Sequence, residues 1–382
     1  MDALTTPSNW QRVRLGDVAE IIGGGTPSTQ VTSFWNGSIN WFTATEIGIT
    51  KYVYKSQRTI TPLGLKKSSA KLLPIGTILL TSRASIGDCA ILKEIATTNQ
   101  GFQSLIPLEK INNEFLYYLM LTLKNKLLEL ASGSTFLEVS PNKIKNLLIP
   151  LPPLNEQIAI ANILSDVDRY LYSLDALILK KESVKKALSF ELLSQRKRLK
   201  GFNQAWQRVR LGDILSYEQP TKYLVATTQY LQKGFTPILT AGKTFILGYT
   251  NDKHGIYTNI PVIIFDDFTT DSKMVNFPFK VKSSAIKILS LRDNNQADLK
   301  YIYEKLTLLK HQVTDHKRYW IDEFSNFEIF LPPLNEQIAI ANILSALDHE
   351  IISLKNKKRQ FENIKKALNH DLMSAKIRVL KE

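Results

Sequence analysis

The stretch that decides the fold is LPPLNEQIAIANILS, which occupies residues 151–165 and recurs without change at residues 331–345. The similarity continues beyond the identical block, at the same offset of 180 residues. Over residues 151–202 and 331–382 the two segments share 26 identities in 52 aligned positions. The sequences upstream of the two copies look unrelated. A repeat of this kind predicts one scaffold element that is used twice to present two different surfaces.

A second, shorter repeat marks where each unit begins. WQRVRLGD at residues 10–17 returns unchanged at residues 206–213, and this offset is 196 residues. Each unit therefore opens with the octet, continues through a variable region and ends in the long repeat. The units span about 10–205 and 206–382, and the chain's last residue falls where a third octet would begin.

The long repeats are predicted to form helices. Pro152 and Pro153 cannot lie in a helix interior, so they form an extended lead-in, and Asn155 is the expected N-cap. No glycine or proline interrupts residues 156–200 or 336–382. Apolar residues then recur at spacings of three and four, which predicts a coiled-coil stripe of about four heptads.

A helix with a single apolar stripe needs a partner, and the other copy is the expected one. The residues predicted to pair the helices are Ile160, Ile163, Val167, Leu174, Val184 and Leu188 in the first copy, and Ile340, Ile343, Leu347, Leu354, Phe361, Ile364 and Leu368 in the second.

The variable regions show a mixture of strand and helix patterns, so the predicted fold class is α+β, with two globular α/β domains joined by two long coiled-coil helices. A helix in the same relative place in each region suggests that the two regions share a fold. The predicted strands are 77–81, 89–92, 260–268 and 283–289, and the predicted helices are 113–131 and 298–312.

The charge balance indicates a polyanionic partner. The formal net charge is +14 and the isoelectric point is about 9.5, which favours nucleic acid first and an anionic membrane second. Cys89 is the single cysteine, so a disulfide within the chain and a cysteine-rich zinc site are excluded. The five histidines have no metal-ligand spacing, and no metal site is predicted. Neither a signal peptide nor a run of about 18 apolar residues is visible, so we expect a cytoplasmic protein.

No catalytic motif is complete, and no catalytic residue is predicted. Gly242–Thr244 ends like a phosphate-binding loop, but Pro237 occupies the leading glycine position and offers no backbone amide. The acids near Lys273 (Asp266, Asp267 and Asp271) come from one local segment, whereas carboxylates that share a metal usually come from separated segments.

Polar and basic side chains of the variable regions fit DNA recognition better. Arginine suits guanine, asparagine and glutamine suit adenine, and lysines suit phosphates. Any one of these residues is more simply a surface residue, so the prediction rests on the set. In the first region the set is Arg58, Lys66, Lys67, Ser82, Arg83, Ser85, Asn99, Gln100, Gln103, Lys143 and Lys145. In the second it is Lys222, Lys243, Asn251, Thr269, Lys273, Lys317 and Arg318.

The organisation of the chain resembles the specificity (S) subunit of type I restriction–modification systems. The matching motifs are the WxxVxLGD octets, LPPLNEQ before each long repeat, GGTPST at 24–29 with FWNGSINW at 34–41, TSRASIG at 81–87 with TNQGFQSL at 98–105, and the segment 265–289. The resemblance covers nearly the whole chain.

The resemblance implies target-recognition domains at 1–150 and 203–330, and conserved long helices at 151–202 and 331–382 that pair antiparallel as a pseudo-two-fold internal repeat. Each domain would recognise one half of an asymmetric bipartite site in double-stranded DNA, and the helices would fix the spacing. Antiparallel pairing would also return the end of the chain to a place beside Trp10.

The resemblance also implies partners. The helices would dock methyltransferase (M) subunits, two of them, and through these the restriction (R) subunit. The chain itself would be non-catalytic and would bind no cofactor, because S-adenosylmethionine, ATP and Mg²⁺ would belong to the partner subunits.

Two other function classes remain open from the residues alone. One is an enzyme with degenerate nuclease or methyltransferase motifs, which predicts that the purified protein turns over DNA without a partner. The other is a coiled-coil adaptor for protein assembly that recognises no DNA sequence. Salt dependence of DNA binding separates an adaptor from a DNA-binding subunit.

Overall fold

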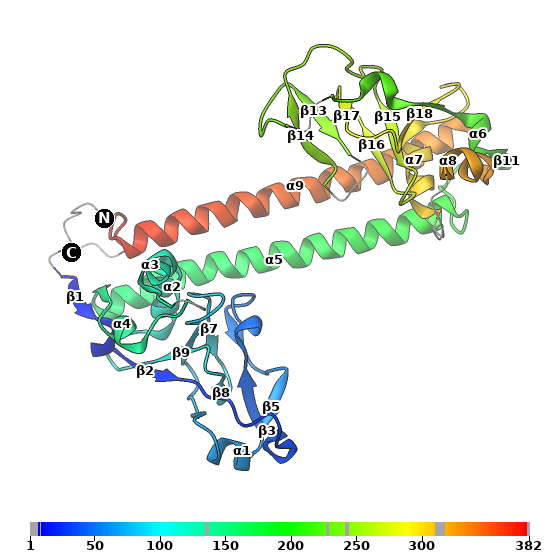
Figure 1. Cartoon of the computed structure of the whole chain (residues 1–382). Coiled ribbons are helices and arrows are strands. Elements are labelled where there is room, and N and C mark those ends of the chain that lie inside the picture. The colour runs from blue at the N-terminus through cyan, green and yellow to red at the C-terminus, as the bar shows by residue number, and fades with distance from the viewer. Residues whose placement is uncertain are drawn as a thin grey trace. The chain divides into compact units, whose positions relative to one another are not determined.

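The computed structural model describes residues 7, 9–133, 137–226, 229–240, 244–309 and 318–379. By its contacts the chain divides into two compact units. Unit 1 comprises residues 1–175 and 356–382, and unit 2 comprises residues 176–355. Each unit holds one globular α/β domain and a part of both long helices (Figure 1). The division between the units falls within the two long helices, at 175/176 and 355/356, and the domain ends at residues 150 and 330 stay a prediction.

The two long helices are confirmed. They are α5 (Leu154–Leu193) and α9 (Leu334–Met373), each of 40 residues, or about 60 Å. Asn155 lies in the first turn of α5 and is not its N-cap. Both helices end earlier than predicted, because Gln195 and Ala375 adopt left-handed backbone angles, with φ of 64° and 59°.

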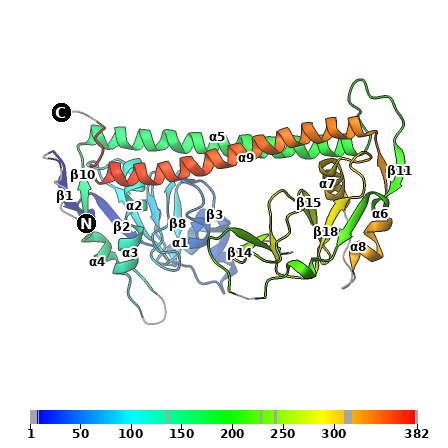
Figure 2. The ribbon, with the colours of Figure 1, turned by 90° about the horizontal axis from the view of Figure 1, so that it is seen from above.

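Within each unit α5 and α9 lie side by side and run in opposite directions (Figures 1 and 2). In unit 1 the Lys358 ammonium is 2.7 Å from Asp175, and Lys365 pairs with Asp168. In unit 2 the same relation appears 180 residues away, where Lys185 Nζ is 2.6 Å from Asp348. The ion pair between Lys365 and Asp168 of unit 1 is therefore repeated in unit 2 as Lys185 with Asp348.

Most residues of the predicted apolar stripe are buried or half-buried, and the exceptions are Val184 and Ile364. Val184 and Ile364 occupy equivalent positions, and their exposed fractions are 44% and 51%. A straight helix drifts about 20° per heptad from a strict 3.5-residue repeat. The contact face has therefore moved one residue onward, to Lys185 and Lys365, which pair with carboxylates of the other helix.

The remaining predicted pairing residues lie on the contact face. Three are buried: Ile160, Leu174 and Ile340. The others are half-buried: Ile163, Val167, Leu188, Ile343, Leu347, Leu354, Phe361 and Leu368.

The domain of unit 1 is built on three sheets, and its core includes the first turns of α5 and the end of α9. One sheet pairs β1 (Gln11–Arg14) with β10 (Leu148–Leu151). The second has the order β2 (Ala19–Gly23), β9 (Gln103–Pro107), β6 (Ile78–Leu80), β7 (Cys89–Leu92), β4 (Tyr52–Val53). The third has the order β5 (Arg58–Ile60), β3 (Trp35–Phe42), β8 (Ala96–Thr98).

The domain of unit 2 follows the same plan. Its strands β11 (Gln207–Arg210) and β19 (Glu328–Leu331) pair as β1 and β10 do. The second sheet has the order β12 (Leu215–Glu218), β18 (Ile286–Leu291), β15 (Val262–Asp266), β16 (Ser272–Val275). The third has the order β14 (Ile246–Thr250), β13 (Thr236–Leu239), β17 (Lys280–Val281), with one antiparallel and one parallel pairing as in unit 1. The expectation that the two variable regions share a fold is supported.

Short helices complete the domains. The predicted helix 113–131 is divided at Leu123 into two helices. The helices of unit 1 are α1 (Pro62–Lys66), α2 (Asn113–Thr122), α3 (Lys124–Leu130) and α4 (Pro141–Lys145), with 3-10 turns at 15–17, 32–34 and 44–46. Those of unit 2 are α6 (Leu211–Ile214), α7 (Leu299–Leu308) and α8 (Tyr319–Asp322), with 3-10 turns at 220–223 and 324–326.

Candidate nucleic-acid interface and its anchorage on the helices

The glutamate of LPPLNEQ ties three parts of the chain together. Glu156 is buried in the first turn of α5, and its carboxylate accepts the Trp10 indole N–H at 3.0 Å. Arg378, beyond the end of α9, donates its Nε to the same carboxylate at 2.9 Å and contacts Asn9. The expectation that the end of the chain returns to a place beside Trp10 is confirmed by these contacts within unit 1.

The same arrangement occurs in unit 2. Glu336 is buried and accepts the Trp206 indole N–H at 3.1 Å, while the Arg198 guanidinium lies 2.6 Å from its carboxylate. The hydrogen bonds that the Arg198 guanidinium donates to this carboxylate raise the pKa of Arg198 above its ordinary value. Each helix therefore begins at a carboxylate that holds the opening tryptophan of its own repeat and the arginine that follows the other helix.

The glutamine of LPPLNEQ orients a helix of each domain. Gln157 accepts a hydrogen bond from the Asn112 backbone N–H at 2.8 Å and donates to the Lys110 and Pro152 carbonyls. Asn112 is the N-cap of α2. In unit 2, Gln337 accepts from the backbone N–H of Asp298, the N-cap of α7, at 2.9 Å. The repeat is thus a scaffold that fixes each domain on the helix pair.

A second point of attachment lies about three turns further along the helices. In unit 1 the Tyr118 hydroxyl of α2 donates to Asp168 of α5 at 2.5 Å. In unit 2 the Lys300 ammonium of α7 is 2.8 Å from Asp348 of α9. Burial alone would raise the pKa of Asp348, but the hydrogen bonds from Lys185 and Lys300 hold it below its ordinary value. Asp168 and Asp348 occupy equivalent positions of the two helices, although their partners in the domains, Tyr118 and Lys300, differ.

The most organised exposed polar group of unit 1 is the guanidinium of Arg58, at the start of β5. Its Cζ lies 3.8 Å from the ring centroid of Trp35 and 5.4 Å from that of Trp41. The two indoles are buried and meet edge to face, with centroids 5.0 Å apart. Their N–H groups donate to the Ser28 and Gly25 carbonyls, at 3.0 and 2.9 Å, so both rings are held in place.

A glycine segment brings a second predicted residue to this surface. The backbone at Gly24 approaches Asn99 so closely that an added Cβ would lie 1.9 Å from the Asn99 carbonyl oxygen. This approach lets the Thr26 hydroxyl donate to the side-chain oxygen of the exposed Gln100. Gly25, whose carbonyl accepts the Trp41 indole N–H, is the neighbour of Thr26 in the chain. The same short segment therefore contacts Gln100 and the tryptophan that lies beside Arg58.

The structure does not support three of the predicted DNA-binding residues. Ser82 is buried, with its hydroxyl bonded to the Gly101 carbonyl, and Gln103 is buried within β9. Arg83 is half-buried and pairs with Glu138 at 2.8 Å. A buried or neutralised group has little to offer DNA, so these assignments are corrected. The motif TSRASIG is a structural loop packed against the segment around Val139.

The other predicted residues differ in exposure. Those exposed are Arg58, Lys66, Lys67, Gln100, Lys143, Lys145, Lys222, Asn251, Thr269 and Arg318; those half-buried are Ser85, Asn99 and Lys273. Lys243 and Lys317 lie outside the described residues. Lys66 and Lys67 follow Arg58 closely along the chain, at the end of α1, which makes Arg58, Lys66, Lys67 and Gln100 the candidate group of unit 1.

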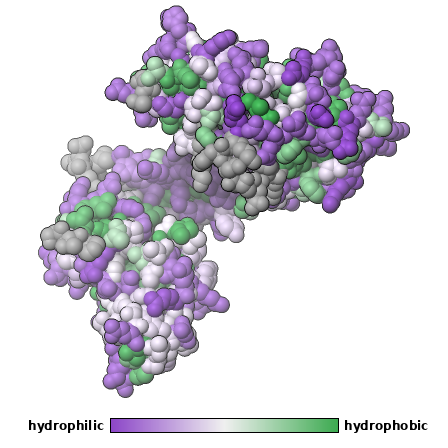
Figure 3. Space-filling model, turned by 45° about the vertical axis from the view of Figure 1, so that its right-hand side comes forward, coloured by the Kyte–Doolittle hydropathy of each residue, from purple (hydrophilic) through white to green (hydrophobic). Residues whose placement is uncertain are grey.

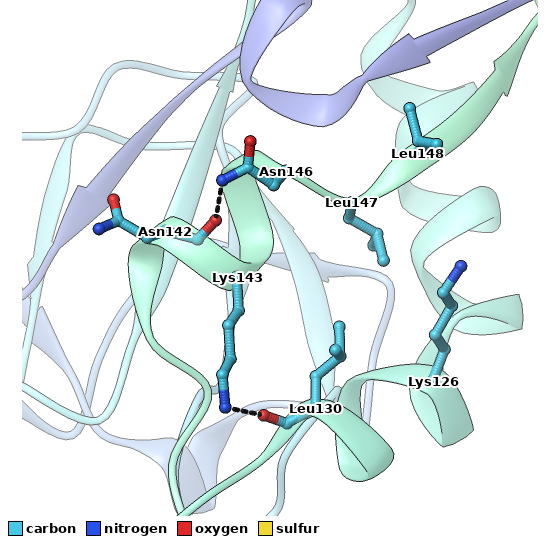
Figure 4. Close-up of a pocket in the computed structure, with 7 residues that line it drawn as sticks. All are labelled: Lys126, Leu130, Asn142, Lys143, Asn146, Leu147 and Leu148. Atoms are coloured by element: carbon cyan, nitrogen blue, oxygen red, sulfur yellow. Dashed lines mark hydrogen bonds between the residues drawn. The ribbon is translucent and has the colours of Figure 1, made fainter.

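Lys143 belongs to a different region. Its ammonium donates to the Leu130 carbonyl at 2.8 Å on one wall of an open cavity of about 410 Å³ (Figure 4). Asn142, Asn146, Lys126 and three leucines complete the lining of this cavity, which lies between α3 and α4. Lys143 is therefore engaged in local packing.

In unit 2 the comparable surface lies over the sheet of β14, β13 and β17. Lys273 lies 4.5 Å from the Phe245 ring centroid, and Lys282 lies 5.7 Å from that of Tyr230. Phe235 is 90% exposed beside Asn251, whose side chain accepts its backbone N–H. The visible face of unit 2 is mostly hydrophilic, at the upper right of Figure 3.

Sequence reasoning missed these aromatic groups. Trp35 and Trp41 both lie in β3, but the strand is irregular between Trp35 and Ile39, so alternation along a regular strand does not predict that the two rings meet. The only signal in the sequence was the presence of two tryptophans in one predicted segment. Phe235 had none, because its exposure depends on the fold around it.

The part of the chain that the structure describes contains no group of three or more His, Cys, Asp or Glu side chains that could hold a metal ion. Among the same residues, no helix combines the length and apolar character needed to cross a membrane.

Comparison with known proteins agrees with this arrangement. The model of the type I restriction modification DNA specificity domain matches residues 7–181 and 203–363. The chain is 29% identical to the MjaIX specificity subunit of Methanocaldococcus jannaschii, over 98% of this chain and 94% of that protein. It is 47% identical to the EcoR124I/EcoR124II specificity subunit of Escherichia coli, over 42% of this chain and 39% of that protein.

A solved structure shows the same fold. The type I restriction–modification S subunit from M. genitalium aligns with a TM-score of 0.62 at 18% identity, over 97% of both chains. At this level of identity the likeness establishes the fold alone.

Proposed function

The chain belongs to the type I restriction–modification DNA specificity family, and from this we propose that each domain recognises one half of an asymmetric, bipartite DNA site. Specificity subunits are the non-catalytic members of these complexes. The observation that supports the proposal is that two domains of the same plan share an identical anchorage but differ in their exposed groups. Glu156 and Glu336 make the same contacts, whereas the exposed groups of the two domains differ. Two different half-sites follow from two different surfaces.

The test is co-expression of the full chain with its methyltransferase subunit, followed by mapping of methylated bases across a genome. We expect a motif of two unlike half-sites separated by a gap of fixed length. A contiguous motif, or no methylation by an active methyltransferase, would contradict the proposal.

We assign the catalytic cofactors to partner subunits. S-adenosylmethionine would be bound by the methyltransferase subunits, and ATP and Mg²⁺ by the assembly that includes the restriction subunit. The chain's own contribution is sequence recognition and attachment of the partners.

Exposed residues that are identical in the two repeats suggest where the methyltransferase subunits dock. Ile158 and Ile338 are equivalent, and each is 42% exposed. Asn155 and Asn162 lie on the same face of α5, are exposed, and are also unchanged in α9. Burial does not account for an identity that is kept at exposed positions. Two copies of one surface fit two copies of one partner.

Ile158→Lys and Ile338→Lys should each remove one methyltransferase subunit from the complex. A charge at the centre of an apolar contact costs about 2 kcal/mol or more, or about a 30-fold loss of affinity. Native mass spectrometry of the complex should show one bound subunit for either single variant and none for the double variant.

Tyr172→Lys is the matched control. Tyr172 is 78% exposed on α5 but is not identical in the second repeat, where Ile352 replaces it. This variant should keep two methyltransferase subunits. Equal losses from Tyr172→Lys and Ile158→Lys would contradict the assignment of the docking face.

A salt series distinguishes the proposed function from a protein-assembly adaptor. If the exposed lysines contact phosphates, the logarithm of DNA affinity falls linearly with the logarithm of salt concentration, with a slope of about −0.9 per contact. With six contacts or more the affinity should fall about 10³-fold between 50 and 200 mM salt. Fluorescence anisotropy with a labelled duplex measures this. A flat response would favour the adaptor.

A further inference from the structure

The Arg58 guanidinium is held as a rigid donor on the surface of unit 1. An exposed arginine normally has several rotatable bonds to order when it binds. Here the planar group lies over Trp35 and close to Trp41, and both indoles are fixed by hydrogen bonds to the backbone. Stacking on an indole occupies the face of the guanidinium and leaves the N–H groups at its edge free to donate.

The charge of Arg58 is also uncompensated within the described residues, where no carboxylate lies within ion-pair distance of it. Arg83 in the same domain differs, because Glu138 neutralises it at 2.8 Å. A stacked guanidinium without an internal acceptor has the two properties that bidentate recognition needs, a fixed plane and free donors.

We propose that Arg58 is a base-recognising residue of the first domain, and that it donates two hydrogen bonds to the O6 and N7 atoms of one guanine in the major groove. This inference rests on the proposed function. It gives Arg58 a role that differs from phosphate binding, because the fixed edge of the guanidinium can donate to O6 and N7 of guanine together, whereas a phosphate contact carries no base identity. Lys66 and Lys67, which are exposed and close in sequence, supply the sequence-independent contacts.

The experiment maps methylation by the full complex for the wild-type chain and for Arg58→Lys, Arg58→Ala and Lys67→Ala. In both Arg58 variants, one guanine of one half-site should become degenerate, with discrimination there reduced about 5- to 150-fold. The other positions and the second half-site should stay unchanged. Lys67→Ala should lower methylation at all sites alike and relax no position.

A second measurement asks whether the contact is to the base. Duplexes in which 7-deazaguanine replaces that guanine lack the N7 acceptor. The wild-type complex should bind them more weakly than the natural duplex, and the Arg58→Ala complex should bind both equally. Thermal unfolding of each variant reports whether loss of the stacked guanidinium has disturbed the tryptophan pair.

The outcomes separate the two proposals. A wild-type bipartite motif that both Arg58 variants leave intact at every position would overturn the assignment of Arg58 alone. Uniform loss of methylation in Arg58→Ala, with full rescue in Arg58→Lys, would also overturn it in favour of phosphate binding. A wild-type chain with no bipartite motif would overturn the proposed function and this inference with it.

Discussion

Glu156→Ala should destabilise unit 1 by about 3 kcal/mol, the lower end of the range for breaking a buried ion pair, because Arg378 keeps some contact with water. The substitution leaves the Trp10 indole N–H and the Arg378 guanidinium without their acceptor. It also separates the opening of the repeat from the end of α9. Chemical denaturation followed by tryptophan fluorescence measures the loss.

Two variants make the measurement specific. Glu156→Gln keeps an acceptor for the indole but removes the charge, so its loss should be intermediate. Asp175 lies on α5, as Glu156 does, and forms a partly exposed ion pair with Lys358 of α9. Asp175→Asn breaks this pair and should cost no more than about 1 kcal/mol of stability. A loss for Glu156→Ala as small as that for Asp175→Asn would show that the buried carboxylate does not hold the parts together.

The repeats made much of the scaffold predictable. An identical block of 15 residues with no glycine, led by two prolines, specifies a helix and its start almost without ambiguity. The roles of Glu156 and Gln157 were not predictable, because their partners lie far away in sequence, at Arg378 and Asn112. A polar residue in the first turn of a helix gives the same sequence pattern whether the fold buries it or leaves it exposed.

The end of the apolar stripe shows a different limit. Val184 and Ile364 fit a heptad, but a small angular drift accumulates along a straight helix and places them outside the contact face. The ion pairs of Lys185 and Lys365 then continue the pairing. Hydrophobic periodicity gives no weight to charged residues and could not have found them.

The candidate interface was the least predictable part. By residue type alone, Arg58, Arg83, Ser82 and Gln100 were all predicted to bind DNA. Burial and ion pairing separate these residues, and both depend on contacts between segments distant in sequence, such as the approach of Gly24 to Asn99.

Insertion of seven residues at equivalent positions of both helices should lengthen the gap between the half-sites by about three base pairs and leave the half-sites unchanged. Two helical turns add about 10.5 Å, which corresponds to about three steps of 3.4 Å along DNA. The sites are the junctions 175/176 in α5 and 355/356 in α9, where the two compact units divide. Seven residues rotate the helix by only about 20° from its original phase, so pairs such as Lys365–Asp168 and Lys185–Asp348 are kept. Mapping of methylated bases measures the gap.

The same insertion in α5 alone is the decisive control, because it lengthens one helix and not its partner. The register on one side of the insertion must then slip, and contacts such as Glu156 with Arg378 and Glu336 with Arg198 cannot both form. Methylation should be lost rather than shifted to a new gap. If the double insertion changed the bases recognised, or left the gap as it was, the helices would not set the spacing. If the single insertion behaved like the double one, the spacing would depend on one helix, and the pairing would serve stability alone.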